Sequence, residues 1–423
     1  MQERTIAVIG LGYIGLPTAA ILASNGTKVI GVDVSDRHVD AVNGGEVPFV
    51  EPDLATHVAG AVSQGLLSAQ KETPKAGTYI VAVPTPFKEG YAADLSYIDA
   101  ATDGIIPQLR GGELIILEST SPPGTTEHLA QRVLDARPDL SLDGSLERPV
   151  VHFAHCPERV LPGRVMIELV TNDRIIGGLT PEAAERARGV YEIFCQARMH
   201  LTDATTAEMA KLTENSFRDV NIAFANELSV IADRLGIDAF ELIELANKHP
   251  RVNILQPGPG VGGHCIAVDP WFIVSAVPED ARLIRTAREV NDHKPEVVLS
   301  RVVERADRFK EPVIATLGLA FKPDIDDLRE SPALEITKQL AQRMPHAKVL
   351  AVEPNVAELP KSLGAFDNVT LEGTIEAIDA ADVVVLLVDH REFKHVDRAL
   401  IAEKAIIDTR GVWRADLARG AKR

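Results

Sequence analysis

The chain is poor in cysteine and has no apolar run long enough to cross a bilayer. Its 423 residues include three cysteines, Cys156, Cys195 and Cys265. An odd number without close spacing argues against a disulfide framework and against a thiolate zinc site, so we expect no bound metal. No apolar stretch approaches the ~20 residues that span a membrane, and a strand pattern begins at the N-terminus without a signal-peptide core. We therefore expect a cytoplasmic protein that makes no membrane contact.

Positive charge is also scarce. The 44 lysines and arginines face 61 aspartates and glutamates, which gives a formal net charge of −17. Such a surface disfavours nucleic acids and anionic membranes as partners. An anionic ligand would have to be held by local arginines, lysines and helix N-termini. The length predicts two or three domains.

A dinucleotide-binding pattern stands at the start of the chain. An apolar strand pattern runs into Gly-x-Gly-x-x-Gly, a helical pattern follows, and a second strand pattern ends at Asp33. Glycines allow the tight turn and the approach of a pyrophosphate, and the carboxylate of Asp33 suits the ribose hydroxyls and repels a 2′-phosphate. We therefore expect NAD, in preference to NADP. The turn residues expected to hold it are Gly10, Gly12, Tyr13, Ile14 and Gly15.

Strand and helix patterns alternate to about residue 200, which predicts a parallel sheet covered on both faces. Its strands end in Pro84-Thr85-Pro86, in Glu118-Ser119-Thr120 and in Cys156-Pro157-Glu158-Arg159. Ligands of such sheets bind at the carboxyl ends of the strands, where these residues fall.

A single long helix is predicted from Asp203 to Leu235, with Gly236 as its stop. At ~1.5 Å per residue it is long for a globular helix, so we expect it to cross between domains. A second α/β unit begins at about residue 311 and lacks Gly-x-Gly-x-x-Gly. The predicted fold is α/β: two Rossmann-like doubly wound domains (1–200 and 311–423) joined by a central helical region (201–310). The long helix has an apolar stripe that we expect to be largely buried and that also suits a dimer: Met209, Leu212, Phe217, Val220, Phe224, Leu228 and Ile231.

Two further features carry reactive groups. Cys265 follows four glycines between residues 258 and 263 and precedes Asp269, and a thiol in such a loop can reach a ligand and act as a nucleophile. The alternative is a structural cysteine beside a turn. Cys156 is a rival nucleophile, which we interpret as a packing residue. On the long helix, spacings of three, four and three place four polar residues on a single face. The alternative interpretation is that this face is simply exposed to solvent. The residues are Glu208, Lys211, Asn215 and Arg218.

Together these motifs resemble the nucleotide-sugar 6-dehydrogenases of the UDP-glucose/GDP-mannose dehydrogenase family, over essentially the whole chain. The stretch from His249 to Phe272 resembles most the branch that oxidises UDP-N-acetyl-D-mannosamine; UDP-N-acetylglucosamine and UDP-glucose are the alternative substrates. Beyond the features above, the resemblance rests on Gly262-Gly263-His264-Cys265, Phe321-Lys322-Pro323 and Arg329-Glu330-Ser331-Pro332.

The resemblance implies a four-electron oxidation of the C6 alcohol to a carboxylate that uses two NAD, and the apolar stripe of the long helix leads us to expect a homodimer. It implies that Cys265 forms a thiohemiacetal and then a thioester, that Lys211 and Asn215 stabilise the oxyanion, and that Asp269 and Glu158 hold water and move protons. The NAD contacts implied beyond the first turn are Thr85, Thr120 and Arg329. The residues implied to bind the UDP-sugar are Arg159, Val160, Lys211, Asn215, Arg218, His249, Arg251, Gly262, Phe321, Lys322 and Arg414.

Two other functions remain open from the residues alone. A two-electron NAD dehydrogenase of a hydroxy acid shares the fingerprint but needs neither Cys265 nor a second α/β domain. A non-enzymatic NAD sensor has no use for Lys211, Asn215 and Cys265 together. The amount of NADH formed per substrate separates these possibilities.

Overall fold

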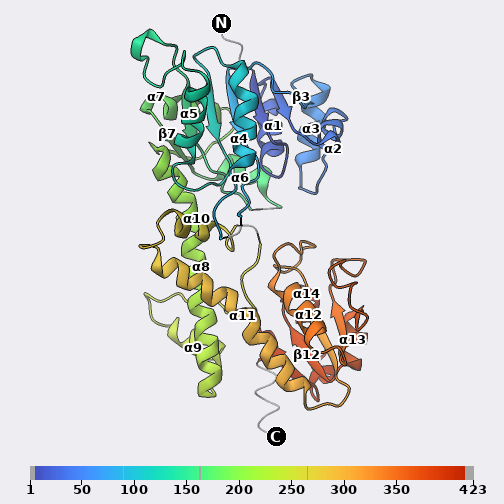
Figure 1. Ribbon diagram of the computed structural model, residues 1–423. Helices are drawn as coiled ribbons and strands as arrows, with labels where there is room; N and C mark the ends of the chain where they lie inside the picture. The colour runs from blue at the N-terminus through green and yellow to red at the C-terminus, as the bar shows by residue number, and fades with distance from the viewer. Residues whose placement is uncertain (1–4, 89, 162, 264, 415–423) are drawn as a thin grey trace. The chain divides into compact units, whose positions relative to one another are not determined.

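The computed structural model describes residues 5–88, 90–161, 163–263 and 265–414. The chain forms two compact units: the first runs to Glu214 and takes in Ser275–Val277, and the second comprises Asn215–Val274 and the chain from Pro278 onward. Helix α8 (Ala204–Leu235) is continuous across this boundary and links the units, as the sequence predicts (Figure 1). The three-part division of the chain stays a prediction.

The first unit holds an eight-stranded sheet in the order β3-β2-β1-β4-β5-β6-β7-β8. All neighbouring strands are parallel except β6 and β7. The strand order reverses between β1 and β4, which is the switch point where dinucleotides bind in such sheets. The strands are β1 (Ile6–Ile9), β2 (Val29–Val32), β3 (Leu67–Gln70), β4 (Thr78–Val81), β5 (Leu114–Leu117), β6 (His152–His155), β7 (Arg174–Gly178) and β8 (Met199–Asp203).

Helices cover both faces of this sheet because successive strand residues point to opposite sides. Val8 and Ile116 pack with α1, α3, α6 and α7, whereas Ile9 and Ile115 pack with α4 and α5. The helices are α1 (Gly15–Ser24), α2 (Asp36–Asn43), α3 (Leu54–Ser63), α4 (Ser96–Ile105), α5 (Thr125–Ala136), α6 (Val165–Thr171) and α7 (Pro181–Tyr191), with 3₁₀ turns η1 (Ile106–Gln108) and η2 (Ser145–Glu147).

The second unit repeats this arrangement on a smaller scale. Its five-stranded parallel sheet has the order β11-β10-β9-β12-β13, which is the order of the first five strands of a doubly wound sheet. The strands are β9 (Val313–Leu317), β10 (Lys348–Val352), β11 (Val369–Leu371), β12 (Val383–Leu386) and β13 (Ala405–Asp408). The remaining helices are α9 (Ala239–Ala246), α10 (Asp269–Ala276), α11 (Arg282–Ala306), α12 (Pro332–Arg343), α13 (Thr374–Ala380), α14 (Arg391–Lys394) and α15 (Arg398–Ile401). The predicted fold class is confirmed.

The apolar stripe of α8 is buried at Leu212, half-buried at Met209, Val220 and Leu228, and exposed at its other three positions. Phe217, Phe224 and Ile231 are 68%, 51% and 45% exposed. The buried face is partly polar: Asp219, which is fully buried, accepts hydrogen bonds from Arg288 and Asn291 of α11. The expectation that this stripe is largely buried was therefore wrong for Phe217, Phe224 and Ile231. The opposite face of α8 is the one that packs against α11, through the charged and amide groups of that helix.

Candidate active site

The turn between β1 and α1 has the shape that a dinucleotide needs. Gly10 has φ 98°, and a Cβ built there would lie 2.5 Å from the carbonyl oxygen of Ala82. A Cβ at Gly15 would lie 1.9 Å from the oxygen of Gly10, so only glycine fits either position. One oxygen of Asp33 accepts a hydrogen bond from the Leu11 amide at 2.8 Å. The turn therefore fits NAD, with α1 starting directly behind it.

Two threonines predicted to contact NAD follow the next strands of the same sheet. Thr85 and Thr120 come after β4 and β5. The hydroxyl oxygen of Thr85 is buried and has no hydrogen-bond partner among the described residues of the chain. A buried hydroxyl of this kind is left for a ligand or water to satisfy. Both residues lie at the carboxyl edge of the sheet that carries the Gly10 turn.

Glu158 lies in a buried cluster of charged groups after β6. Its Oε2 accepts from Arg174 at 3.2 Å and its Oε1 accepts from the Arg159 amide at 2.7 Å. Arg174 also stacks 4.6 Å from the ring centre of Tyr191 and approaches the Cys156 thiol at 3.8 Å. The guanidinium therefore fixes one carboxylate oxygen of Glu158 within the first unit. Sequence reasoning missed Arg174, which stands alone in an otherwise apolar strand.

The same cluster surrounds Cys156 and should make its thiol a poor nucleophile. Burial raises the pKa of its thiol to about 12. Because the thiolate is the nucleophile, such a thiol is inert near neutral pH. Cys265, by contrast, is exposed. This contrast favours Cys265 as the reactive cysteine.

The predicted polar face of α8 divides into residues with different surroundings. Glu208 is buried and accepts from the Gly124 and Thr126 amides at 2.6 and 2.7 Å, so it caps α5. Lys211 is half-buried one turn later, and Arg218 is exposed. Glu208 is therefore a structural residue, and the roles of Lys211, Asn215 and Arg218 stay predictions.

Asn215 and Asp269 are brought together although 54 positions separate them. The Asn215 amide nitrogen donates to Asp269 Oδ2 at 2.5 Å, and both residues are buried. The Asp269 amide also donates to the Cys265 carbonyl oxygen at 2.8 Å. Two of the predicted catalytic side chains and the backbone of a third are thus joined. His264, between them in sequence, lies outside the described residues.

The glycine loop before Cys265 packs closely against the segment between β9 and α12. A Cβ at Gly262 would lie 2.4 Å from the Glu330 carbonyl oxygen, and one at Gly263 would lie 3.0 Å from the Phe321 ring. Phe321 and Lys322, in the loop after β9, are half-buried. The predicted substrate residues Gly262, Phe321 and Lys322 therefore share one region.

The remaining predicted substrate residues are more dispersed. His249 and Arg251 are exposed, and His249 Nδ1 accepts from the Arg251 amide at 3.3 Å. In the first unit, Arg159 forms an ion pair with Glu214 at 2.6 Å, and Val160 packs against the apolar core. Arg329, which the family pattern assigns to NAD, pairs with Asp327 at 2.7 Å.

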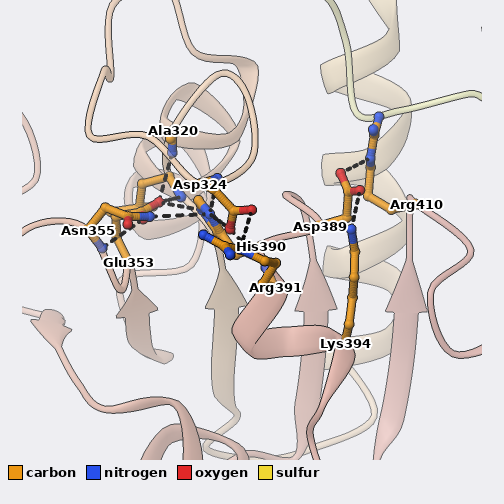
Figure 2. Close-up of polar contacts among 10 residues, drawn as sticks. Ala320, Asp324, Glu353, Asn355, Asp389, His390, Arg391, Lys394 and Arg410 are labelled. Atoms are coloured by element: carbon orange, nitrogen blue, oxygen red, sulfur yellow. Dashed lines mark hydrogen bonds and ion pairs between the residues drawn. The ribbon is translucent and has the colours of Figure 1, made fainter. Parts of the chain in front are cut away.

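Arg410 and Arg414 both follow β13 but pair with different carboxylates. Arg410 pairs with Asp389 at 3.0 Å (Figure 2) and reaches the Pro257 carbonyl oxygen at 3.5 Å, beside the glycine loop. Arg414, which is predicted to bind the UDP-sugar, pairs with Glu244 of α9 at 2.8 Å and lines a cavity of about 230 Å³ that Pro257 also lines. Asp408-Thr409-Arg410, directly after β13, is the signal that could have identified Arg410.

None of the helices that the structure describes is both long and apolar enough to cross a membrane. Within the same residues, no three histidine, cysteine, aspartate or glutamate side chains are grouped so that they could hold a metal ion.

Comparison with known proteins places the chain in a family. Three domain models of the UDP-glucose/GDP-mannose dehydrogenase family match the chain. The model of the NAD binding domain matches residues 4–195, that of the central domain matches 205–293, and that of the UDP binding domain matches 315–415. The chain is 54% identical to the UDP-N-acetyl-D-mannosamine dehydrogenase of Escherichia coli K12, over 98% of this chain and 100% of that one. It is 57% identical to the NDP-N-acetyl-D-galactosaminuronic acid dehydrogenase of Ralstonia solanacearum, over 97% of each chain.

A solved structure shares the fold as well as the sequence. The UDP-N-acetyl-mannosamine dehydrogenase of Staphylococcus aureus is 40% identical, with a TM-score of 0.84 over 96% of this chain and 95% of that one. The family, the NAD cofactor and the class of enzyme expected from the motifs are confirmed. The chain belongs to the UDP-glucose/GDP-mannose dehydrogenase family and is an NAD-dependent nucleotide-sugar dehydrogenase.

Proposed function

We propose that the protein oxidises the C6 alcohol of UDP-N-acetyl-D-mannosamine to the carboxylate of UDP-N-acetyl-D-mannosaminuronate. The observation that carries the proposal is full-length identity of 54–55% to UDP-N-acetyl-D-mannosamine dehydrogenases of several bacteria. An N-acetyl group needs room for a methyl and a partner for its amide. A sugar with a plain hydroxyl would leave that partner unpaired, at about 1–3 kcal/mol.

Cys265 is the nucleophile of this proposal. Two molecules of NAD, bound in turn, would each accept one of the two hydrides that leave C6. The thiolate of Cys265 adds to the resulting aldehyde to give a thiohemiacetal, which keeps its C–H bond and can therefore lose a second hydride. The product is a thioester, which water cleaves to the acid and the free thiol. Covalent attachment also retains the reactive aldehyde.

Asn215 and Asp269 support this chemistry through their shared hydrogen bond. The bond leaves the second amide hydrogen of Asn215 available to an oxyanion at C6, and the exposed thiol of Cys265 is joined to Asp269 through its backbone. Lys211, one helical turn away, supplies a positive charge for the same oxyanion. Such donors are each worth ~10²–10³ in rate.

Glu158 is proposed to hold the water that cleaves the thioester. Its carboxylate is buried and fixed by Arg174, so it is held in one orientation. A positioned carboxylate of this kind can accept a proton from water.

A second candidate substrate follows from the relative at 57% identity, whose name specifies an NDP-N-acetyl-D-galactosaminuronic acid. Both kinds of relative carry an N-acetylated sugar in their names. This agreement supports an N-acetylhexosamine more strongly than it supports one particular configuration.

The proposed assembly is a homodimer formed through α8. Phe217, Phe224 and Ile231 are seven residues apart and exposed, so they form one apolar stripe along the helix. Exposed apolar stripes of this kind mark association surfaces. We also propose a cytoplasmic location, because reducing compartments keep a catalytic thiol such as Cys265 free.

The test is to incubate the purified enzyme with NAD and each of several UDP-sugars and to measure NADH and the sugar product. We expect two NADH per sugar with UDP-N-acetyl-D-mannosamine and the highest kcat/KM with that substrate. C265A should form no uronate, whereas C156A, with a buried and unreactive thiol, should retain the parental stoichiometry. Highest turnover of UDP-glucose would refute the N-acetyl assignment, and one NADH per substrate would refute the four-electron reaction.

A further inference from the structure

The loop after β9, residues 318–324, is held at both ends by a buried glutamate–histidine pair (Figure 2). Glu353 follows β10 and His390 follows β12, so both stand at the carboxyl edge of the second sheet. Their residues are 4% and 1% exposed, and His390 Nε2 lies 3.0 Å from Glu353 Oε2.

Glu353 fixes the beginning of the loop. Its Oε2 accepts hydrogen bonds from the Leu319 amide at 2.8 Å and from the Ala320 amide at 3.0 Å. Burial by itself raises the pKa of this carboxyl, but the hydrogen bonds from His390 and from the two amides outweigh burial and bring the pKa to about 2. The carboxylate is therefore ionised at neutral pH, and charged acceptors form the stronger hydrogen bonds.

His390 fixes the end of the loop. The Asp324 amide donates to His390 Nδ1 at 2.9 Å. A backbone N–H can only donate, so Nδ1 is the acceptor and the ring proton lies on Nε2, directed at Glu353. The Asp324 carboxylate in turn accepts from the Arg391 amide at 2.9 Å. One imidazole thus connects the two ends of the loop.

The loop so held carries groups that face the Cys265 segment. Phe321 lies between the two fixed ends, and Cβ atoms built at Gly262 and Gly263 would each lie 3.0 Å from its side chain. The position of the Phe321 ring therefore sets the space available to the glycines that precede Cys265.

We propose that Glu353 and His390 are positioning residues, which hold Phe321 and Lys322 in the conformation that binds the UDP part of the substrate. The proposal rests on the proposed function for the identity of the ligand. Neither residue takes part in the oxidation. Their loss should weaken binding of UDP and of the UDP-sugar while it spares NAD binding and the chemical step.

The experiment compares two variants of one side chain in the full-length protein. In H390N the amide oxygen can replace Nδ1 and still accept from the Asp324 amide; in H390Q the amide nitrogen can replace Nε2 and still donate to Glu353. H395Q, the same change at an exposed histidine after α14, is the matched control. L340A removes core packing from α12 and controls for general destabilisation.

The probe is UDP, titrated calorimetrically, and kcat and both KM values are measured alongside thermal unfolding. We expect H390Q to bind UDP about tenfold more weakly than the parent, because the part-buried N–H of Asp324 loses its acceptor, and H390N to lose less. KM for the UDP-sugar should rise with the dissociation constant of UDP, whereas kcat and KM for NAD stay within about twofold. H395Q and L340A should bind UDP as the parent does.

Several outcomes would overturn the proposal. If H390Q binds UDP within twofold of the parent, His390 has no positioning role. If L340A loses as much UDP affinity as H390Q does, the loss reflects general destabilisation of the fold. Weaker binding by H390N than by H390Q would contradict the part assigned to Asp324. If the parent oxidises no UDP-N-acetyl sugar but H390Q still binds UDP more weakly, the proposed function fails and the positioning role stands. If the parent does not bind UDP, both fail.

Discussion

Replacement of Glu118 by glutamine should stabilise the first unit, and the gain should grow with pH. Glu118 follows β5 and is 1% exposed. Its two oxygens accept from the Thr18 and Tyr191 hydroxyls, each at 3.1 Å. Burial, together with the nearby Glu158 carboxylate, raises the pKa of Glu118 to about 8 from an ordinary value of 4.5.

The sign follows from the protons bound in each state. Between pH 4.5 and pH 8 the folded chain keeps a proton on Glu118 that the unfolded chain has lost. The free energy of unfolding therefore falls by about 1.4 kcal/mol for each pH unit in this window. Below pH 4.5 the stabilisation that comes from the proton on Glu118 is fully present, and above pH 8 it is lost completely. Glutamine has the shape of the neutral acid and no proton to lose, so E118Q lacks this slope.

The assay is urea unfolding at about pH 5.5 and pH 7.5. Both tryptophans, Trp271 and Trp413, belong to the second unit, so their fluorescence follows that unit, whereas far-UV circular dichroism follows both. Unfolding of the first unit is the transition that changes the circular dichroism without changing the fluorescence. In this transition, the difference in free energy of unfolding between E118Q and the parent should grow by about 2–3 kcal/mol over these two pH units. E127Q, at an exposed position of α5, should show no such growth. A gap for E118Q that stays constant with pH would refute the reasoning.

Three other predictions concern the reaction and the assembly. The parent should use NAD with a higher kcat/KM than NADP because Asp33 would repel a 2′-phosphate; equal use of both cofactors contradicts this. K211A should lower kcat by about 10²–10³ and leave NAD affinity unchanged, and a change confined to NAD affinity would place Lys211 elsewhere. F224D, on the exposed stripe of α8, should give monomers in sedimentation experiments, with the exposed-site change E227Q as control; a dimeric F224D would remove α8 from the interface.

Strands could be predicted from the sequence where they are runs of apolar residues. They could not be predicted where they carry charged or exposed residues. The predicted strands that match β1, β2, β4 and β5 are buried runs of aliphatic residues. β7 was missed because it begins with the buried Arg174 and ends in two glycines, and β8 because its side chains are half-buried or exposed. Charge inside a strand and exposure at the edge of a sheet both remove the apolar signal on which such predictions depend.

The same limit applies to the candidate site. Groups that follow a recognisable local pattern, such as the turn at Gly10 and the loop before Cys265, could be found in the sequence. Partners contributed by other secondary-structure elements could not: Arg174 for Glu158, Arg410 for the Pro257 carbonyl, and His390 for Glu353. Their pairing depends on strand order, which brings together residues far apart in the chain.

Asp33 and Glu353 occupy equivalent positions in the two sheets but have different surroundings. Each follows the strand next to the first strand of its sheet, and each accepts at 2.8 Å from the amide that follows a glycine of positive φ, Leu11 in one case and Leu319 in the other. The Asp33 side chain remains 12% exposed, whereas that of Glu353 is 0% exposed because His390 covers it.

The helices that follow differ as well. α1 starts at Gly15, directly after its turn, but α12 starts only at Pro332, beyond the whole Phe321 loop. Pyrophosphate binding uses the amides of a helix that begins at the turn, and ribose binding uses an accessible carboxylate. Among the described residues, the first sheet alone combines both at its switch point. The phosphates of a UDP ligand at the second sheet would therefore depend on side-chain cations such as Lys322 and Arg410, in a chain whose net charge of −17 offers no general attraction.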